Sequence, residues 1–281
     1  MDTCVGFVTY GGVEFTKLLV ESVKRTTDKV DMFAVVGKVD DHDTINYLTK
    51  EGIPFIIHHT NMGFPVGVND IYDYVWKENQ YKYLILAGND IITYDYAINS
   101  LIKQADETDY EVISAYQYDV RELVKDFPEV KETFLGRDCI IRDFSTEPWN
   151  KFKGGSPVLE LADMQMFDIQ NLCLYKKSVF DRVGYLDANF YPAYFVDNDY
   201  ARRIVLSGIK NCTLLNARFF HFWSRVLKQG SGGSAPHFFE NNRRYYINKW
   251  GGGLGQETKT PELSIFDRSY EFDAVTYWKT H

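Results

Sequence analysis

The strongest constraint on the fold is a regular alternation of apolar runs and helical stripes over the first 116 residues. Between short apolar runs, apolar side chains recur at helical spacing, most clearly in 68–76 and 98–105. The runs typical of buried strands are 4–9, 31–36, 54–58, 83–87 and 111–116. This alternation predicts an α/β fold with a mostly parallel sheet flanked by helices. In such sheets ligands bind at the carboxyl ends of the strands, so the loops that follow these runs are candidate sites.

The pattern weakens after residue 118 and then returns. Residues 119–163 mix charges with Pro and Gly, which indicates an irregular segment of the kind that shapes a binding site. A strand is predicted at 167–174, a helix at 177–183 and another that ends near Gly208. Residues 229–236 (QGSGGSAP) are typical of a flexible loop, and a helix ends at 251–253. We expect one domain over 1–225 and a C-terminal extension of loop, helix and tail over 226–281.

Composition excludes some classes of protein. Of the 281 residues, 45% are hydrophobic and 25% are charged, which argues against wholesale disorder. The formal net charge of −8 disfavours a protein held to nucleic acid by bulk charge. Residues 201–250 nevertheless contain nine Lys or Arg and a single acid, Glu240. This basic block indicates either a site for an anionic ligand or a solvated basic face.

The four cysteines, Cys4, Cys139, Cys173 and Cys212, stand singly along the chain. Reduced, mostly buried thiols are therefore expected, rather than a zinc site or a disulfide framework. No apolar stretch reaches the length of a membrane span, and residues 1–7 lack the basic lead and apolar run of a secretory signal. We accordingly expect a cytoplasmic protein.

Two of the candidate sites follow predicted strands. Gly88, Asn89 and Asp90 come directly after the run 83–87. A carboxylate at that position suits a hard cation such as Mg²⁺ or Mn²⁺, although an Asx-turn is the alternative. Residues 60–63 (TNMG), with Asn69 near a helix start, form a turn whose backbone N–H groups could face phosphate.

Two further candidates lie later in the chain. Asp197 and Asp199 open a predicted helix, where paired carboxylates either cap the helix or supply a general base. His221 stands among four aromatic residues in the segment 219–223 (FFHFW). A histidine in such surroundings is more often a core residue than a ligand.

In this order and spacing, the segments resemble those of the family 2 glycosyltransferases, which have the GT-A fold. Residues 60–69 resemble the family's N-x-G-[FA]…N segment, and 84–90 correspond to its strand ending in the D-x-D motif. Residues 171–187 (NLCLYKKSVFDRVGYLD) and 195–203 (FVDNDYARR) resemble two later segments, and His221 matches a late histidine. The resemblance covers about residues 3 to 225.

The resemblance implies a Rossmann-like GT-A domain that binds a nucleoside-diphosphate sugar, with a UDP-sugar as the expected donor. It also implies Mn²⁺ or Mg²⁺ on the diphosphate. An acceptor hydroxyl, on a polysaccharide, a glycan or a phosphate-bearing polymer, would attack the anomeric carbon with inversion.

Roles transfer residue by residue from the resemblance. Asp90 and His221 are expected to bind the metal, and Asp197 to act as the general base. The acceptor is expected to contact Trp149, Phe152 and Asp199. The expected donor contacts are Thr9, Tyr10, Gly11, Asp41, Asn61, Gly63, Asn69, Asn89 and Arg225. Lys228, Arg243 and Arg244 could hold diphosphate, with residues 229–236 as a lid.

The sequence departs from the family pattern at Gly88, where the first D-x-D acid is expected, and at Val196, which replaces a Glu. Either Asp41 or Asp43 could meet the nucleoside. Two alternatives remain. A sugar-phosphate nucleotidyltransferase would need an Arg-bearing loop after the first strand, and residues 10–14 (YGGVE) have no Arg. A non-catalytic protein that binds carbohydrate or nucleotide sugar would also use these aromatic and acidic residues.

Overall fold

The computed structural model describes residues 1–94, 96–118, 161–162, 171–222 and 235–260. The strands of the described part form one nine-stranded sheet in the order β3-β2-β1-β4-β8-β6-β9-β5, with β7 paired to β9. Their bounds are β1 Thr3–Thr9, β2 Asp31–Val36, β3 Phe55–Ile57, β4 Tyr83–Gly88, β5 Ile91–Thr93, β6 Val112–Tyr118, β7 Leu161–Ala162, β8 Leu172–Lys176 and β9 Asn211–His221.

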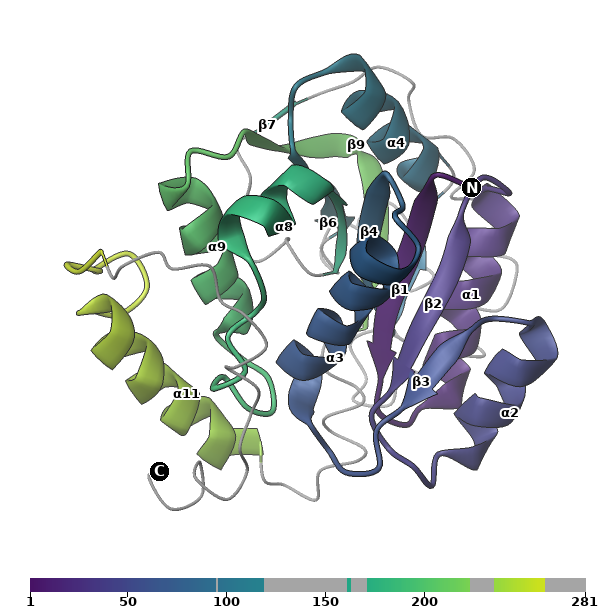
Figure 1. Cartoon of the computed structure of the whole chain (residues 1–281), viewed down its shortest axis with the longest axis horizontal. Coiled ribbons are helices and arrows are strands. Elements are labelled where there is room, and N and C mark those ends of the chain that lie inside the picture. Colours follow the sequence, from purple (N-terminus) through teal and green to yellow (C-terminus); the bar gives the residue numbers. More distant parts are fainter. Residues whose placement is uncertain (95, 119–160, 163–170, 223–234, 261–281) are drawn as a thin grey trace, which may run out of the picture.

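Helices cover both faces of this sheet (Figure 1). One face packs against α1 Val13–Thr26, α2 His42–Glu51 and α4 Ala97–Glu107. The other packs against α3 Gly63–Tyr72 with its π-helical continuation η1 Asp73–Glu78, α8 Lys177–Val183 and α9 Val196–Leu206. Helix α11 Ala235–Trp250 lies on the outer side of α9 (Figure 1). Side chains along β4 alternate between the two cores, as the two-residue period of a strand requires: Leu84 and Leu86 face one core, Ile85 and Ala87 the other.

The predicted α/β fold class is confirmed, and the structure adds the strand directions. β3, β2, β1 and β4 run parallel, but β8 inserts antiparallel between β4 and β6, so the sheet is mixed. The 31–36 strand and the 177–183 helix have the predicted bounds. The 68–76 helix instead begins at Gly63, which places Asn69 in the middle of α3. Sequence analysis missed β5 and β9.

The C-terminal helix belongs to the same core as the sheet. Tyr246 and Trp250 of α11 are fully buried in the cluster that contains Val68 of α3 and Tyr200 of α9. The rings of Phe195 and Tyr246 lie 5.7 Å apart. The helix of the predicted extension therefore packs directly on α9.

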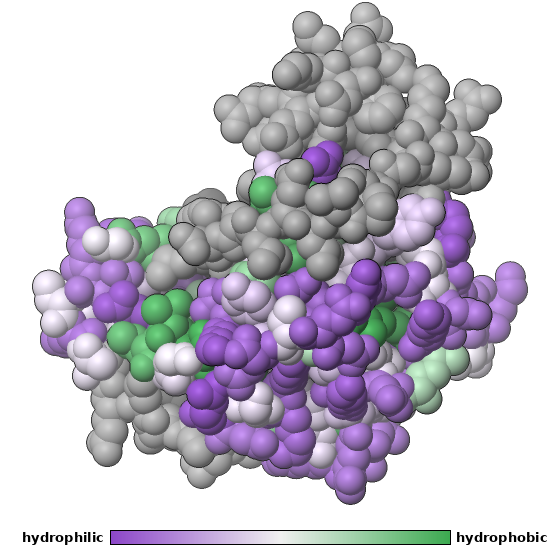
Figure 2. All heavy atoms as spheres, turned by 90° about the horizontal axis from the view of Figure 1, so that it is seen from above, coloured by the Kyte–Doolittle hydropathy of each residue, from purple (hydrophilic) through white to green (hydrophobic). Residues whose placement is uncertain are grey.

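The described surface is mostly polar on the face shown in Figure 2, where hydrophobic residues gather only in small, separate patches. Exposed large apolar side chains are scattered over several elements, such as Tyr96, Val205 and Leu254. No helix within the described residues combines the length and the apolar character that crossing a bilayer requires.

Candidate active site

Asp90 and His221 lie side by side, although 131 positions separate them in the chain. Asp90 follows β4, and the next residue, Ile91, pairs with His221 in the ladder between β5 and β9. The Phe222 N–H donates to the Asp90 backbone oxygen at 2.9 Å, which fixes the register. His221 Nε2 consequently lies 3.1 Å from Asp90 Oδ1, and the two side chains are only 15% and 10% exposed.

The donor atoms of this pair fit a divalent metal. His221 Nδ1 lies 3.2 Å from Gln117 Oε1. When Nδ1–H donates to Gln117, Nε2 turns its lone pair toward the Asp90 carboxylate, which leaves two electron-pair donors facing each other. A carboxylate oxygen and an imidazole nitrogen, the latter oriented by a hydrogen bond through its other nitrogen, form a suitable donor set for Mn²⁺.

The pair supplies two of the ligands that a divalent ion takes. Within the described residues, no group of three or more His, Cys, Asp and Glu side chains gathers in a way that could hold a metal ion. Mg²⁺ and similar ions are often held by one or two carboxylates together with substrate phosphates and water. Asp90 and His221 therefore fit a metal that the protein shares with a bound diphosphate.

The loop after β1 is built around Thr9. Asn89 Nδ2 donates to Thr9 Oγ1 at 3.4 Å, and Thr9 Oγ1 lies 3.3 Å from the hydroxyl of Thr16. The Thr9 side chain is fully buried, so its hydroxyl supports the loop through these contacts. The next two residues, Tyr10 and Gly11, are partly exposed.

Asp41 connects the first two βα loops. Its Oδ2 accepts the Gly11 N–H at 3.1 Å, and its Oδ1 accepts the Thr44 N–H at 3.3 Å as the N-cap of α2. Asp41 thus fixes the position of the Gly11 loop. Asp43 lies one position inside α2 and is exposed.

The segment 61–64 contacts the chain just before α9. Asn61 Oδ1 accepts the Gly63 N–H at 3.0 Å, and Gly63 has a φ of +83°, so the predicted tight turn is confirmed. A Cβ on Gly63 would lie 2.9 Å from Tyr191 Cδ2 and 3.1 Å from the Pro192 oxygen. The start of α3 is therefore packed against the loop that leads into α9.

Asn69 has a different role from the predicted one. Both ends of its side-chain amide bond to Leu186: Nδ2 donates to the backbone oxygen at 3.0 Å, and Oδ1 accepts the N–H at 2.8 Å. The residue is 7% exposed. Asn69 therefore joins α3 to the loop after α8.

Asp197 lies in the first turn of α9 and is partly exposed. Its Oδ1 accepts the N–H of Asn198 at 2.9 Å. Burial raises the pKa of Asp197 to about 6, and backbone N–H groups offset only part of that rise. A carboxylate with this pKa is ionised at neutral pH and is still basic enough to accept a proton from a hydroxyl.

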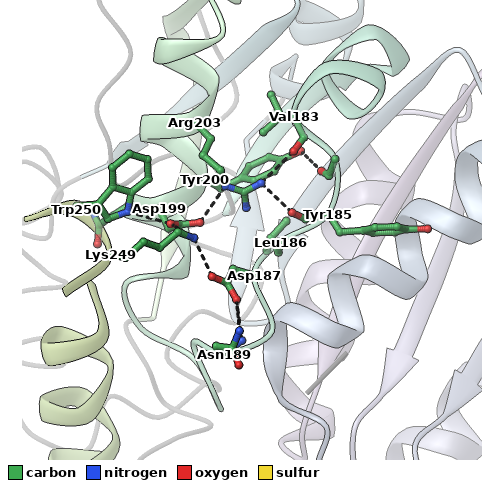
Figure 3. A network of polar contacts seen from close by, with 12 residues as sticks. Val183, Tyr185, Leu186, Asp187, Asn189, Asp199, Tyr200, Arg203, Lys249 and Trp250 are labelled. Carbon is green, nitrogen blue, oxygen red and sulfur yellow. Dashed lines mark hydrogen bonds and ion pairs between the residues drawn. The ribbon is translucent and has the colours of Figure 1, made fainter. Parts of the chain in front are cut away.

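Asp199, a predicted acceptor contact, has a fully buried side chain that takes part in an ion-pair network (Figure 3). Arg203 Nε donates to Asp199 Oδ2 at 3.0 Å. Asp199 Oδ1 accepts a hydrogen bond from Trp250 Nε1 at 2.9 Å and lies 2.6 Å from Lys249 Nζ. Lys249 also lies 2.8 Å from Asp187 Oδ2. Burial alone would raise the pKa of Asp187, but Lys249 and further hydrogen bonds hold it below its ordinary value.

The basic block is largely neutralised by acids in the described part of the chain. Its ion pairs are Arg202 with Glu257, Arg203 with Asp199, Lys210 with Asp109, Arg243 with Glu240, and Lys249 with Asp187 and Asp199. Arg244 donates to Asn241 Oδ1 at 2.6 Å. Lys249 and Arg202 join α9, α11 and neighbouring loops through these pairs, whereas the pairs of Arg203, Arg243 and Arg244 each lie within one helix. Lys228 and the predicted contacts Arg225, Trp149 and Phe152 lie outside the described residues.

Sequence reasoning missed Gln117 and the partners of Asp199. Gln117 is a polar residue between two tyrosines near the end of a strand, which is a weak signal. Lys249 and Trp250 had been assigned only to a basic block and to the end of a helix, because nothing local links them to residue 199.

No family model matches the chain, and no curated protein matches it. Solved structures do. A mannosyltransferase from Pyrobaculum calidifontis, PcManGT in complex with GDP-Man and Mn²⁺, has a TM-score of 0.58 and 10% identity over 93% of this chain and 66% of its own. S. aureus TarS has a TM-score of 0.57 and 12% identity over 90% and 40% of the two chains. For TarS 1–349 the TM-score is 0.56, with 12% identity over 93% and 77%.

The chain therefore has the fold of glycosyltransferase structures. It spans 66% and 40% of the length of the first two of these proteins. At 10 to 12% identity the likeness establishes the fold alone, and the reaction must be argued from the site.

Proposed function

We propose that the chain is a glycosyltransferase that moves a sugar from a nucleoside-diphosphate sugar to an acceptor hydroxyl. The observation that carries this proposal is the buried pair of Asp90 and His221, 3.1 Å apart at the carboxyl end of β4. In open α/β sheets this edge is where ligands bind. Support also comes from the mannosyltransferase of similar fold, whose structure contains GDP-Man and Mn²⁺.

Each residue has a separate task in this reaction. Asp90 and His221 would hold Mn²⁺ or Mg²⁺, which would offset the negative charge that builds on the departing diphosphate. Gln117 keeps the His221 ring oriented through Nδ1. Asp197 accepts the proton of the acceptor hydroxyl as the oxygen attacks the anomeric carbon from the face opposite the leaving group, which inverts its configuration.

We propose a UDP-sugar as the donor and a polysaccharide, a glycan or a phosphate-bearing polymer as the acceptor. The Gly11 loop, with Asp41 behind it, and the turn at Asn61 and Gly63 form the expected donor side. Trp149 and Phe152 remain the proposed stacking residues for the acceptor, by analogy with the family that the sequence resembles.

The test is the release of nucleoside diphosphate from UDP-sugars and GDP-sugars with Mn²⁺, first without an acceptor and then with candidate polymers. Asp90→Asn is expected to lower the release at least about 100-fold with the fold intact by circular dichroism. Asp109→Asn is the control, because Asp109 pairs with an exposed lysine at the opposite edge of the sheet.

Two results would overturn the proposal. Wild-type release by Asp90→Asn would remove the metal assignment. Binding of nucleotide sugar without turnover, unchanged in Asp197→Asn, would identify a non-catalytic nucleotide-sugar-binding protein instead.

A further inference from the structure

Asn171 lies directly across from Gly88, the position where the D-x-D motif would have its first acid. β4 and β8 are antiparallel, and their register pairs Ala87 with Leu172. The Gly88 N–H continues this ladder by donating to the Asn171 backbone oxygen at 2.8 Å. Directly opposed residues in an antiparallel pair carry their side chains on the same face of the sheet. The Asn171 side chain and any side chain at position 88 would therefore lie on the same face of the sheet.

The Asn171 amide fills the space beside Gly88. A Cβ on Gly88 would lie 3.2 Å from Asn171 Oδ1 and 3.5 Å from Asp90 Oδ1. Asn171 Oδ1 and Asp90 Oδ1 thus both lie next to the position of a Cβ atom on residue 88, where the side chain of a first D-x-D acid would begin. Ile91 Cγ2 lies 3.2 Å from that point as well, so a larger residue at position 88 would have to displace a neighbour.

The Asn171 side chain takes no part in the hydrogen bonding of the described residues. It is partly exposed, and within the described residues no hydrogen bond engages its amide group. Asn69, in contrast, uses both ends of its amide on one backbone partner. A polar side chain at a strand end that makes no internal hydrogen bond is free to bind a ligand.

We propose that Asn171 supplies the oxygen ligand that Gly88 lacks, so that the divalent cation is held by Asp90, His221 and Asn171 together with the diphosphate. This inference rests on the proposed function. Asn carbonyl oxygens are ordinary ligands for hard divalent cations. Because the amide is neutral, the site carries one negative charge fewer than a site with two D-x-D carboxylates. The cation is therefore bound weakly by the protein alone and more tightly once a nucleoside diphosphate is present.

The test measures Mn²⁺ binding by the loss of the free-ion electron paramagnetic resonance signal, with and without UDP or GDP and with no sugar donor. Asn171→Ala is expected to weaken Mn²⁺ binding at least about tenfold in the presence of nucleotide. Asn171→Asp adds a charge and is expected to strengthen binding without nucleotide by a similar factor. Asn248→Ala, at an exposed position of α11, is the matched control and should bind like wild type.

Moving the oxygen ligand from position 171 to position 88 tests whether weaker Mn²⁺ binding comes from the loss of a ligand or from a disturbed fold. Gly88→Asp alone is expected to bind Mn²⁺ no better than wild type, since the Asn171 oxygen occupies the space. Gly88→Asp combined with Asn171→Ala frees that space and is expected to regain affinity relative to Asn171→Ala. Circular dichroism and thermal unfolding of each variant check that it is folded.

The outcomes distinguish this inference from the proposed function. Wild-type Mn²⁺ affinity in both Asn171 variants, with loss of binding in Asp90→Asn, would overturn the role of Asn171 and leave the proposed function intact. Failure of sugar transfer alongside the expected Asn171 effects would overturn the proposed function alone. Absence of Mn²⁺ binding by the wild-type protein with nucleotide would overturn both metal assignments.

Discussion

Replacing Asp197 by Asn is expected to stabilise the protein above about pH 6 while it abolishes sugar transfer. Burial raises the pKa of this carboxyl from 3.8 to about 6, so the folded state resists its ionisation. The sign follows from linkage. A group with a higher pKa when folded than when unfolded lowers stability as the pH rises above the unfolded pKa, and its full cost is reached above the folded pKa. A neutral amide at this position avoids that cost.

The magnitude follows from the size of the shift. About two pKa units at about 1.4 kcal/mol each give at most about 3 kcal/mol. Water reaches the partly exposed side chain, so we expect a gain of about 1 to 3 kcal/mol at about pH 8 and none at about pH 4. The amide oxygen of Asn can still accept the Asn198 N–H that now bonds Oδ1, so the local hydrogen bond is retained.

Asp199→Asn is the matched control, because the same change is made two positions along the helix. Asp199 is fully buried with Arg203 and Lys249, and neutralising it leaves two buried cations short of a partner. Removal of one member of a buried ion pair costs about 3 to 5 kcal/mol. The assay is urea unfolding of both variants at about pH 4 and about pH 8, with activity in parallel. A loss of stability in Asp197→Asn, or a gain that does not change with pH, would refute the reasoning.

Three further outcomes are expected. For the proposed sugar transfer, the kcat/KM of the wild-type protein should fall about tenfold per pH unit below about pH 6, because protonated Asp197 cannot accept a proton; a flat profile to about pH 5 would remove its assignment as base. Gly63→Ala should cost more than about 2 kcal/mol in urea unfolding and Gly52→Ala about 1 kcal/mol, since both have positive φ but only the former meets neighbouring atoms; equal losses would contradict the packing argument. Lys249→Met should lower Tm by about 6 to 20 °C at neutral pH; an unchanged Tm would show the network to be dispensable.

The elements that could be predicted from the sequence are those whose pattern is local. The apolar runs that became β1, β2 and β4 are continuous because both faces of those strands are buried. β5 spans three residues, and its one partner among the described strands is β9, which begins 118 positions later than the last residue of β5. The antiparallel direction of β8 likewise depends on pairing with β4 and β6. Neither property leaves a periodic signal in the chain.

The site shows the same division between local and distant information. Asp197 and Asp199 stand in one helical turn, and no sequence pattern tells which of them stays open to a substrate. Trp250 and Lys249, about 50 positions later, decide it by burying Asp199. Asn69 was misread for the same reason, since its partner Leu186 lies 117 positions away. Residue type and order indicate candidate residues, and packing separates those that are buried in the core from those that are partly exposed.

The C-terminal helix and the candidate base form one structural unit. Tyr194 and Phe195 have φ values of +70° and +63°, an uncommon conformation for such large residues, immediately before α9. Asn242 of α11 donates to the backbone oxygens of Ala193 and Tyr194, and the Phe239 ring lies 5.5 Å from Tyr194 and 5.1 Å from Phe195.

Residues Phe239 and Asn242 of α11 thus contact the strained turn before Asp197. Further along α11, Lys249 and Trp250 bind the carboxylate of Asp199. Strain of this kind persists only where the surroundings enforce it. The position of the candidate base therefore depends on residues beyond 235, although the resemblance to glycosyltransferases ends near residue 225. A chain without α11 would lose these contacts and expose the buried carboxylates of Asp187 and Asp199. For this reason α11 is better regarded as part of the unit that positions Asp197 than as an appendage to it.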